Sequence, residues 1–116
     1  MTFEMRFQHW KKRFSGAFQN PPEELFAIAV TLTDLDGKKL YIANTGAGFE
    51  IAPYDYIDYT AAIETTADRF TRLLNGSLSA ERAAADGRIA ARGNLEHVKL
   101  LHRIADRPPR RMRAAG

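Results

Sequence analysis

The chain has 116 residues, a formal net charge of +3 and 45% hydrophobic residues. This length and composition predict one folded domain with a core of its own, and they exclude a second domain or a wholly disordered chain. Because the sequence contains no cysteine, a disulfide framework, a thiolate metal site and a cysteine nucleophile are also excluded.

Both ends of the sequence carry charge. Charges interrupt the apolar residues at the start, so no secretory signal is expected there, and no uncharged run approaches the roughly 20 residues of a membrane span. We therefore expect a soluble, cytoplasmic protein. Residues 107–116 hold much of the excess positive charge and are predicted to be a flexible tail after a domain over 1–106. Such a tail could attract nucleic acid or anionic lipid, but fraying is the simpler interpretation, and no nucleic-acid partner is predicted.

The first predicted element is an amphipathic helix that begins near Phe3 and ends near Asn20. Its aromatic residues recur every three or four positions and so share one stripe, while Pro21 and Pro22 forbid continuation. The stripe is expected to pack on a sheet; the alternative is a helix that contacts a membrane surface with its basic side. The stripe consists of Phe3, Phe7, Trp10, Phe14 and Phe18, and the opposite side carries Arg6, His9, Lys12 and Arg13.

An antiparallel meander is predicted next. Residues 25–33 are rich in Ile, Val, Phe and Thr, and the dipeptide Asp36-Gly37 is a strong hairpin signal that returns the chain through 38–43. After a glycine-rich break, Phe49–Ala52 resumes as another short extended segment. Two or three antiparallel strands result.

A fourth strand and a capped helix follow. Ala61–Thr65 is predicted to be a strand with Ile63 pointing inward, and Thr66 is a plausible N-cap for a helix over Ala67–Asn75. Gly76 is the expected left-handed residue at the end of that helix.

The last third predicts two more helices around a very short strand. Ser79 caps a helix over 80–86, a strand over 88–92 lies between two glycines, and Asn94 begins a final helix with one apolar face. This order of elements predicts an α+β domain, with one sheet and helices gathered on one face.

The spacing of Gly76, Gly87 and Gly93 resembles the C-terminal half of the sterol carrier protein type-2 domain, also called the non-specific lipid-transfer domain. Asn94 stands where an acidic residue is commoner in that family, a harmless change because both residue types cap helices. The chain ends in Ala-Ala-Gly, so the peroxisomal tripeptide of the eukaryotic carriers is not carried over. The matching positions are Ala67-Asp68, Leu73, Gly76, 83–85, Gly87-Arg88-Ile89, Gly93-Asn94 and Leu100-Leu101.

The resemblance implies a five-stranded, mainly antiparallel sheet with helices packed on one face and an apolar tunnel between the layers. The tunnel would hold a fatty acid, a sterol-like molecule or an isoprenoid lipid, without a cofactor. The alanines of 83–85 and 90–91 could leave space for a ligand or could simply allow close packing of a helix on the sheet. An arginine such as Arg88 or Arg92 could meet a carboxylate head at the tunnel mouth. The candidate ligand-binding residues are Phe49, Tyr54, Tyr56, Phe70, Ala84, Ile89, Ala91 and Leu101.

Signals of catalysis and metal binding are weak. His97 and His102 are five positions apart on the last predicted helix, so they do not share a face as metal ligands would. Asp55 and Asp58 flank Tyr56, which would suit a small isomerase with a carboxylate base and a phenol donor, although aspartates in such a loop are usually solvated. We therefore predict a non-catalytic, bacterial lipid carrier without a metal. The alternative is an accessory module that dimerises or presents a hydrophobic substrate to a partner enzyme, with the N-terminal aromatic stripe as its docking face.

Overall fold

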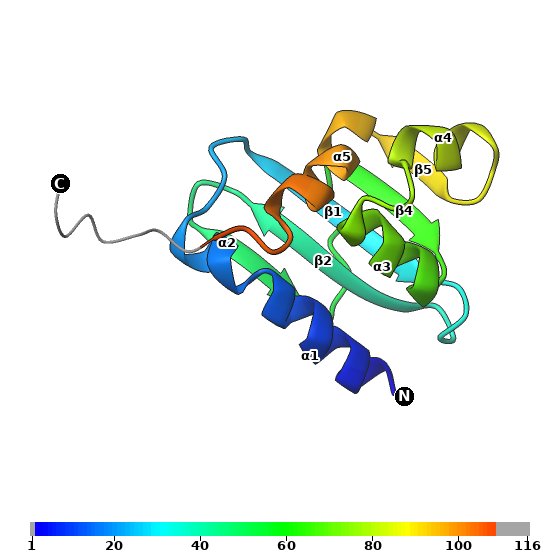
Figure 1. The fold of residues 1–116 in the computed structure, drawn as a ribbon, viewed down its shortest axis with the longest axis horizontal. Helices are drawn as coiled ribbons and strands as arrows, with labels where there is room; N and C mark the ends of the chain where they lie inside the picture. The colour runs from blue at the N-terminus through cyan, green and yellow to red at the C-terminus, as the bar shows by residue number, and fades with distance from the viewer. Residues whose placement is uncertain (1, 109–116) are drawn as a thin grey trace, which may run out of the picture.

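The computed structural model describes residues 2–108. They form one mixed five-stranded sheet and five helices that pack on it (Figure 1). The helices gather on one face of the sheet, as the sequence predicts. The strands are β1 (Phe26–Leu32), β2 (Lys38–Asn44), β3 (Phe49–Ala52), β4 (Ala61–Thr65) and β5 (Ala90–Gly93). The helices are α1 (Phe3–Arg13), α2 (Ser15–Gln19), α3 (Ala67–Asn75), α4 (Ala80–Ala85) and α5 (Leu95–Ile104).

The strand order is β3-β2-β1-β4-β5. β1, β2 and β3 form the predicted antiparallel meander, and β4 pairs with β5 in the same antiparallel sense. β4 itself lies parallel to β1, so the connection over 53–60 must cross from the β3 edge past β2 and β1. The predicted fold class, an α+β domain with a five-stranded and mainly antiparallel sheet, is confirmed.

Different parts of the chain cover the two faces of the sheet. On the inner face, beneath the helices, Ile28, Ile42 and Ile51 lie in register across three strands and are at most 4% exposed. On the outer face β1 carries the small residues Ala27, Ala29 and Thr31. The 53–60 connection lies against this face, because the ring of Tyr56 is 4.8 Å from that of Tyr41 on β2. The crossover therefore shields part of a face that has no helix.

Two polar side chains are buried at the inner face of the sheet. The amide nitrogen of Asn44 donates to the backbone carbonyls of Pro22 and Glu24, at 2.7 and 2.9 Å, and so fixes the loop that leads into β1. The hydroxyl of Thr65, at the end of β4, has no hydrogen-bond partner among the described residues although the side chain is 2% exposed. A buried hydroxyl without a partner destabilises the fold.

The N-terminal segment is not the single helix that the sequence predicts. Phe14 leaves the helical conformation, with φ −96° and ψ 8°, and a separate helix, α2, begins at Ser15. The break lets Phe18 pack edge-on against Phe49 at 5.1 Å between ring centroids and brings Gly16 against the carbonyl of Arg107. The aromatic stripe does pack on the core as predicted, although Phe18 remains 44% exposed.

Local capping signals place α3 and α5 where the sequence predicts them. The hydroxyl of Thr66 accepts a hydrogen bond from the backbone N–H of Arg69, and Asn94 accepts one from Glu96 in the same way. Gly76 ends α3 with φ +78°, in the left-handed region.

The position of β5 differs from the prediction. The sequence predicts a strand over 88–92, whereas the structure has Ala90–Gly93. The backbone N–H groups of Arg88 and Ile89 both donate to the carbonyl of Ala83 at the end of α4. Because these donors are already used, neither residue joins the sheet, and the strand begins later. α4 likewise ends at Ala85, one residue before its predicted end.

Candidate functional site

The layer between the helices and the sheet holds most of the predicted ligand-binding residues. Phe70 and Leu101 are fully buried there, and Ile89 and Phe49 are 3% and 9% exposed. Phe70 meets Trp10 edge-on at 4.9 Å between ring centroids, so aromatic side chains from α1 and α3 interlock above the sheet. Two smaller residues of the predicted set, Ala84 and Ala91, are partly buried against the same core. An open tunnel among these side chains stays a prediction.

The two predicted tyrosines lie elsewhere. Tyr54 is 68% exposed, and Tyr56 packs on Tyr41 at the outer face of the sheet. Burial raises the pKa of the Tyr41 phenol, and its hydrogen bond to Glu50 adds to the effect. The structure therefore does not bring Tyr54 and Tyr56 together with the buried members of the predicted set.

The arginines proposed for a lipid carboxylate already have partners. The guanidinium of Arg88 donates to both carboxylate oxygens of Asp86 at 2.9 Å, and this ion pair lowers the pKa of Asp86. Arg92 lies 3.4 Å from the carboxylate of Glu64 at the exposed end of the sheet. Neither arginine is therefore free to pair with the carboxylate of a lipid.

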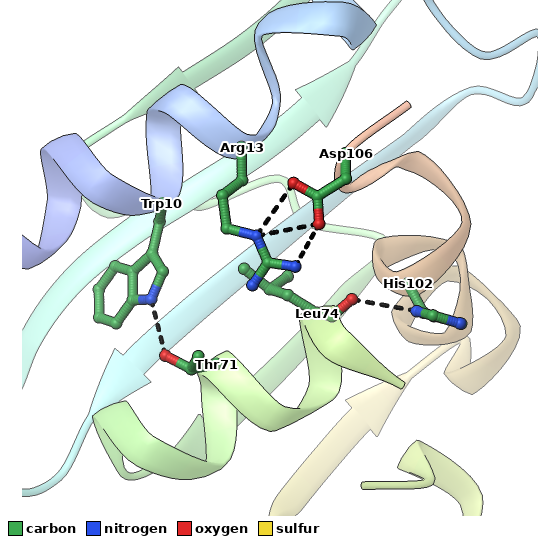
Figure 2. A network of polar contacts seen from close by, with 6 residues as sticks. All are labelled: Trp10, Arg13, Thr71, Leu74, His102 and Asp106. Atoms are coloured by element: carbon green, nitrogen blue, oxygen red, sulfur yellow. Dashed lines mark hydrogen bonds and ion pairs between the residues drawn. The ribbon is translucent and has the colours of Figure 1, made fainter. Parts of the chain in front are cut away.

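A hollow of about 210 Å³ opens between α3, α4 and α5. Its walls include apolar side chains from three helices, and His102 lies at its edge, with its Nδ1 3.0 Å from the Leu74 carbonyl (Figure 2). Because a carbonyl only accepts, this nitrogen donates, which leaves Nε2 without the ring proton in the neutral imidazole. The lining consists of Leu73, Gly76, Leu78, Ser79, Ala80, Val98, Lys99 and His102.

A larger hollow, of about 460 Å³, lies between α1, α3 and the segment after α5. Figure 2 shows how its walls are joined: the indole of Trp10 donates to the hydroxyl of Thr71 at 3.0 Å, and Arg13 reaches the carboxylate of Asp106. The basic residues of α1 predicted on the side opposite the aromatic stripe border this hollow together with Trp10. The lining consists of Arg6, His9, Trp10, Lys12, Arg13, Thr71 and Asp106.

The Arg13–Asp106 pair ties α1 to the end of the described chain. Arg13 Nε lies 3.2 Å from each carboxylate oxygen, and the backbone N–H of Asp106 donates to the Arg13 carbonyl at 2.7 Å. The hydrogen bond from Arg13 lowers the pKa of the Asp106 carboxyl. The domain boundary after residue 106 stays a prediction, and 109–116, the greater part of the predicted tail, lie outside the described residues.

The residues considered for catalysis are not assembled into a site. The carboxylate of Asp55 accepts a hydrogen bond from the backbone N–H of Tyr56 and is exposed. His97 lies 2.7 Å from the hydroxyl of Thr60, a contact that joins α5 to the start of β4. Within residues 2–108, no three His, Cys, Asp or Glu side chains come together as metal ligands would. None of the helices in this part of the chain is long and apolar enough to span a membrane.

This arrangement of sheet and helices is the fold of the sterol carrier protein type-2 domains. No protein-family model matches the chain, and no curated protein matches it significantly. The likeness to solved structures, at 10–16% sequence identity, therefore establishes the fold alone.

Three solved structures illustrate the likeness. The first is the UbiJ-SCP2 ubiquinone synthesis protein, with a TM-score of 0.67 and 10% identity over 89% of this chain and 94% of that one. The second is palmitated SCP2L2 from Aedes aegypti, with a TM-score of 0.61 and 12% identity over 96% of this chain and 100% of that one. The third is the inverting sec-alkylsulfatase Pisa1 from Pseudomonas sp., with a TM-score of 0.68 and 12% identity over 91% of this chain but only 16% of the sulfatase.

Proposed function

We propose that this protein is a non-catalytic carrier that binds a hydrophobic ligand between its helices and its sheet. The observation that carries the proposal is the hollow between α3, α4 and α5, whose lining residues Leu73 and Val98 belong to the same hydrophobic core as Phe70 and Leu101. The fold supports it, because similar structures include carriers described with palmitate. A fatty acyl or isoprenoid chain buried there would contribute about 0.8 kcal/mol for each CH₂ removed from water.

The ligand-binding residues follow from this proposal. The apolar lining of the hollow would contact the ligand first, and none of the predicted ligand-binding residues belongs to that lining. Phe70, Ile89 and Leu101 would contact a chain that extends from the hollow into the buried layer, while the small side chains of Ala84 and Ala91 would leave room for it. Phe49 lies on the edge strand β3 against Phe18, so it would meet only a ligand that crosses the sheet. The rim of the hollow carries Lys99, a cation whose pKa is raised by its hydrogen bond to Glu96. An apolar interior with a few polar groups at the rim is typical of pockets for amphiphilic ligands.

The first test is to look for a ligand that accompanies the purified protein. Solvent extraction and native mass spectrometry of the same batch should give a stoichiometric fatty acid, isoprenoid or other lipid, and the stripped protein should take up a fluorescent fatty acid. A protein that is empty after purification and takes up no fluorescent fatty acid would refute the carrier.

A second test uses two alanines of the same helix. Ala80 lines the hollow, whereas Ala85 is exposed at the other end of α4. Ala80→Leu should fill part of the hollow and weaken fatty-acid binding by about fourfold to fifteenfold, since it displaces one or two methylenes of the ligand at about 0.8 kcal/mol each. Ala85→Leu should leave uptake unchanged. Equal uptake by the two variants would exclude this hollow from the binding site.

A second candidate function is an accessory or dimerisation module that presents a hydrophobic substrate to a partner enzyme. The exposed apolar side chains of the 53–60 connection favour it, because Ile57 is 87% and Tyr54 68% exposed. The predicted docking face, the aromatic stripe, is largely covered, since Phe7, Trp10 and Phe14 are buried. Sedimentation of the protein and of Ile57→Ser tests dimerisation: an association that Ile57→Ser abolishes supports the module, and a monomer in both removes the homodimer. Contact of α1 with a membrane surface stays a prediction.

A further inference from the structure

The hollow between α1 and α3 combines excess positive charge with an aromatic wall. Arg6, Trp10 and Arg13 recur at intervals of four and three along α1, which places them on one side of the helix, toward Thr71 of α3. At about 460 Å³ the hollow has room for a group much larger than a water molecule.

The charges that line this hollow do not balance among the described residues. Asp106 contributes the carboxylate, and Arg13 already binds it through both oxygens. Arg6 and Lys12 form no ion pair with any carboxylate in residues 2–108. The hollow therefore presents two further cations without a described counter-charge.

One of these cations also has an unmet hydrogen-bonding need. The Nε of Arg6 is buried from solvent, yet it has no partner within residues 2–108. A buried guanidinium N–H without an acceptor is costly, and carboxylates and phosphates are the acceptors that match its geometry. An oxygen-rich anion in the hollow would supply the missing acceptor and the missing negative charge together.

We propose that this hollow binds an oxyanion of the phosphate or carboxylate class between Arg6 and Lys12, beside the indole of Trp10. The anion is either a free one or the head group of an amphiphile. A head group would deepen the proposed carrier function, on which that part of the inference rests. The path into the core would then run past Trp10, which contacts Phe70 edge-on at 4.9 Å.

The sole tryptophan of the chain is the probe for this proposal. Because Trp10 borders the hollow and its Nε1–H donates to Thr71, both its fluorescence and its indole N–H resonance should respond to a bound anion. The full chain is titrated at low ionic strength, where screening is weak, with inorganic phosphate, with octyl phosphate below its micelle concentration and with uncharged 1-octanol.

Three charge-to-neutral variants locate the site. Arg6→Gln and Lys12→Gln should each weaken binding of inorganic phosphate about tenfold, the usual effect of losing one charge-assisted hydrogen bond. Lys11→Gln removes the same charge from the same helix but not from the lining of the hollow, and it should change the affinity less than twofold. Lys12 is exposed, so its replacement is expected to leave the fold intact, which the unshifted indole resonance of the free variant would confirm.

The outcomes separate the sources of the anion. Phosphate binding without tighter binding of octyl phosphate supports a site for a free anion; octyl phosphate bound at least tenfold more tightly, with 1-octanol silent, supports a head group. A Trp10 signal that ignores both anions, that responds equally to 1-octanol, or that weakens equally in Lys11→Gln overturns the proposal. Inorganic phosphate has no acyl chain, so these results do not depend on whether the fatty-acid test of the carrier succeeds.

Discussion

Two glycines in similar backbone conformations should differ sharply in their tolerance of alanine. Gly87 and Gly93 both have positive φ values, +80° and +81°. A Cβ at Gly87 would meet nothing within 4 Å, whereas a Cβ at Gly93 would lie 2.3 Å from the backbone carbonyl oxygen of Thr60. Alanine at 87 therefore tests the conformation alone, and alanine at 93 tests the conformation and the close contact together.

The expected magnitudes follow from these contacts. The left-handed conformation costs an alanine about 1–2 kcal/mol, which should be the whole effect of Gly87→Ala. In Gly93→Ala the Thr60 carbonyl must also move by roughly 1 Å to restore an ordinary contact. That carbonyl accepts a hydrogen bond at 2.9 Å from the backbone N–H of Asn94, the N-cap of α5. Losing the bond and disturbing the cap add about 2 kcal/mol, for a total of about 3–4 kcal/mol.

Thermal unfolding followed by circular dichroism measures both variants. At about 4 °C for each kcal/mol in a domain of this size, the midpoint should fall by about 4–8 °C for Gly87→Ala and by about 12–16 °C for Gly93→Ala. Equal losses in the two variants would show that the approach of β5 to Thr60 is not a tight contact, and the assigned junction of β4, β5 and α5 would then be wrong.

Three further changes test individual polar contacts. Thr65→Val should raise the free energy of unfolding by about 1 kcal/mol in urea, because it removes a buried hydroxyl without a described partner; a loss of stability would mean that the hydroxyl is bonded. Asn44→Asp should lower it by about 3 kcal/mol or more, since a carboxylate would face two carbonyl oxygens without a proton to donate, and an unchanged urea midpoint would contradict those bonds. The lowered pKa of Asp106 means that its bond to Arg13 stabilises the fold fully above the ordinary carboxyl pKa and loses this effect as pH falls through the lowered value. The difference in unfolding free energy between wild type and Asp106→Asn should therefore be constant near neutral pH and shrink in acid, and a difference that grows in acid would refute the ion pair.

The elements with strong local signals could be predicted from the sequence. Thr66 and Gly76 mark the two ends of α3 by their own chemistry, and the structure confirms both. The meander was predictable because residues rich in Ile, Val, Phe and Thr come before the hairpin dipeptide Asp36-Gly37. The resemblance to the sterol carrier domains supplied the single five-stranded sheet with helices on one face, whereas the order of its strands came only from the structure.

The features that the sequence did not predict depend on contacts between residues far apart in the chain or on groups that compete for one hydrogen-bond partner. β5 begins later than predicted because the carbonyl of Ala83 takes the N–H groups of Arg88 and Ile89, and no local propensity records that competition. The hollow beside Trp10 was missed because its other walls come from Thr71 and Asp106. Thr71 is 61 residues from Trp10, and Asp106 is 93 residues from Arg13. The basic residues of α1 were visible in the sequence, but the surface that they face was not.

The bond between Arg13 and Asp106 also sets an order of events during synthesis. Since the two residues are 93 positions apart, α1 leaves the ribosome long before the segment that holds it in place exists. Its buried aromatic residues, Trp10 among them, must wait for the sheet and for α3 before they are covered. Because a domain generally folds as a unit, α1 comes first among the helices of this domain in sequence but is among the last to be held in place.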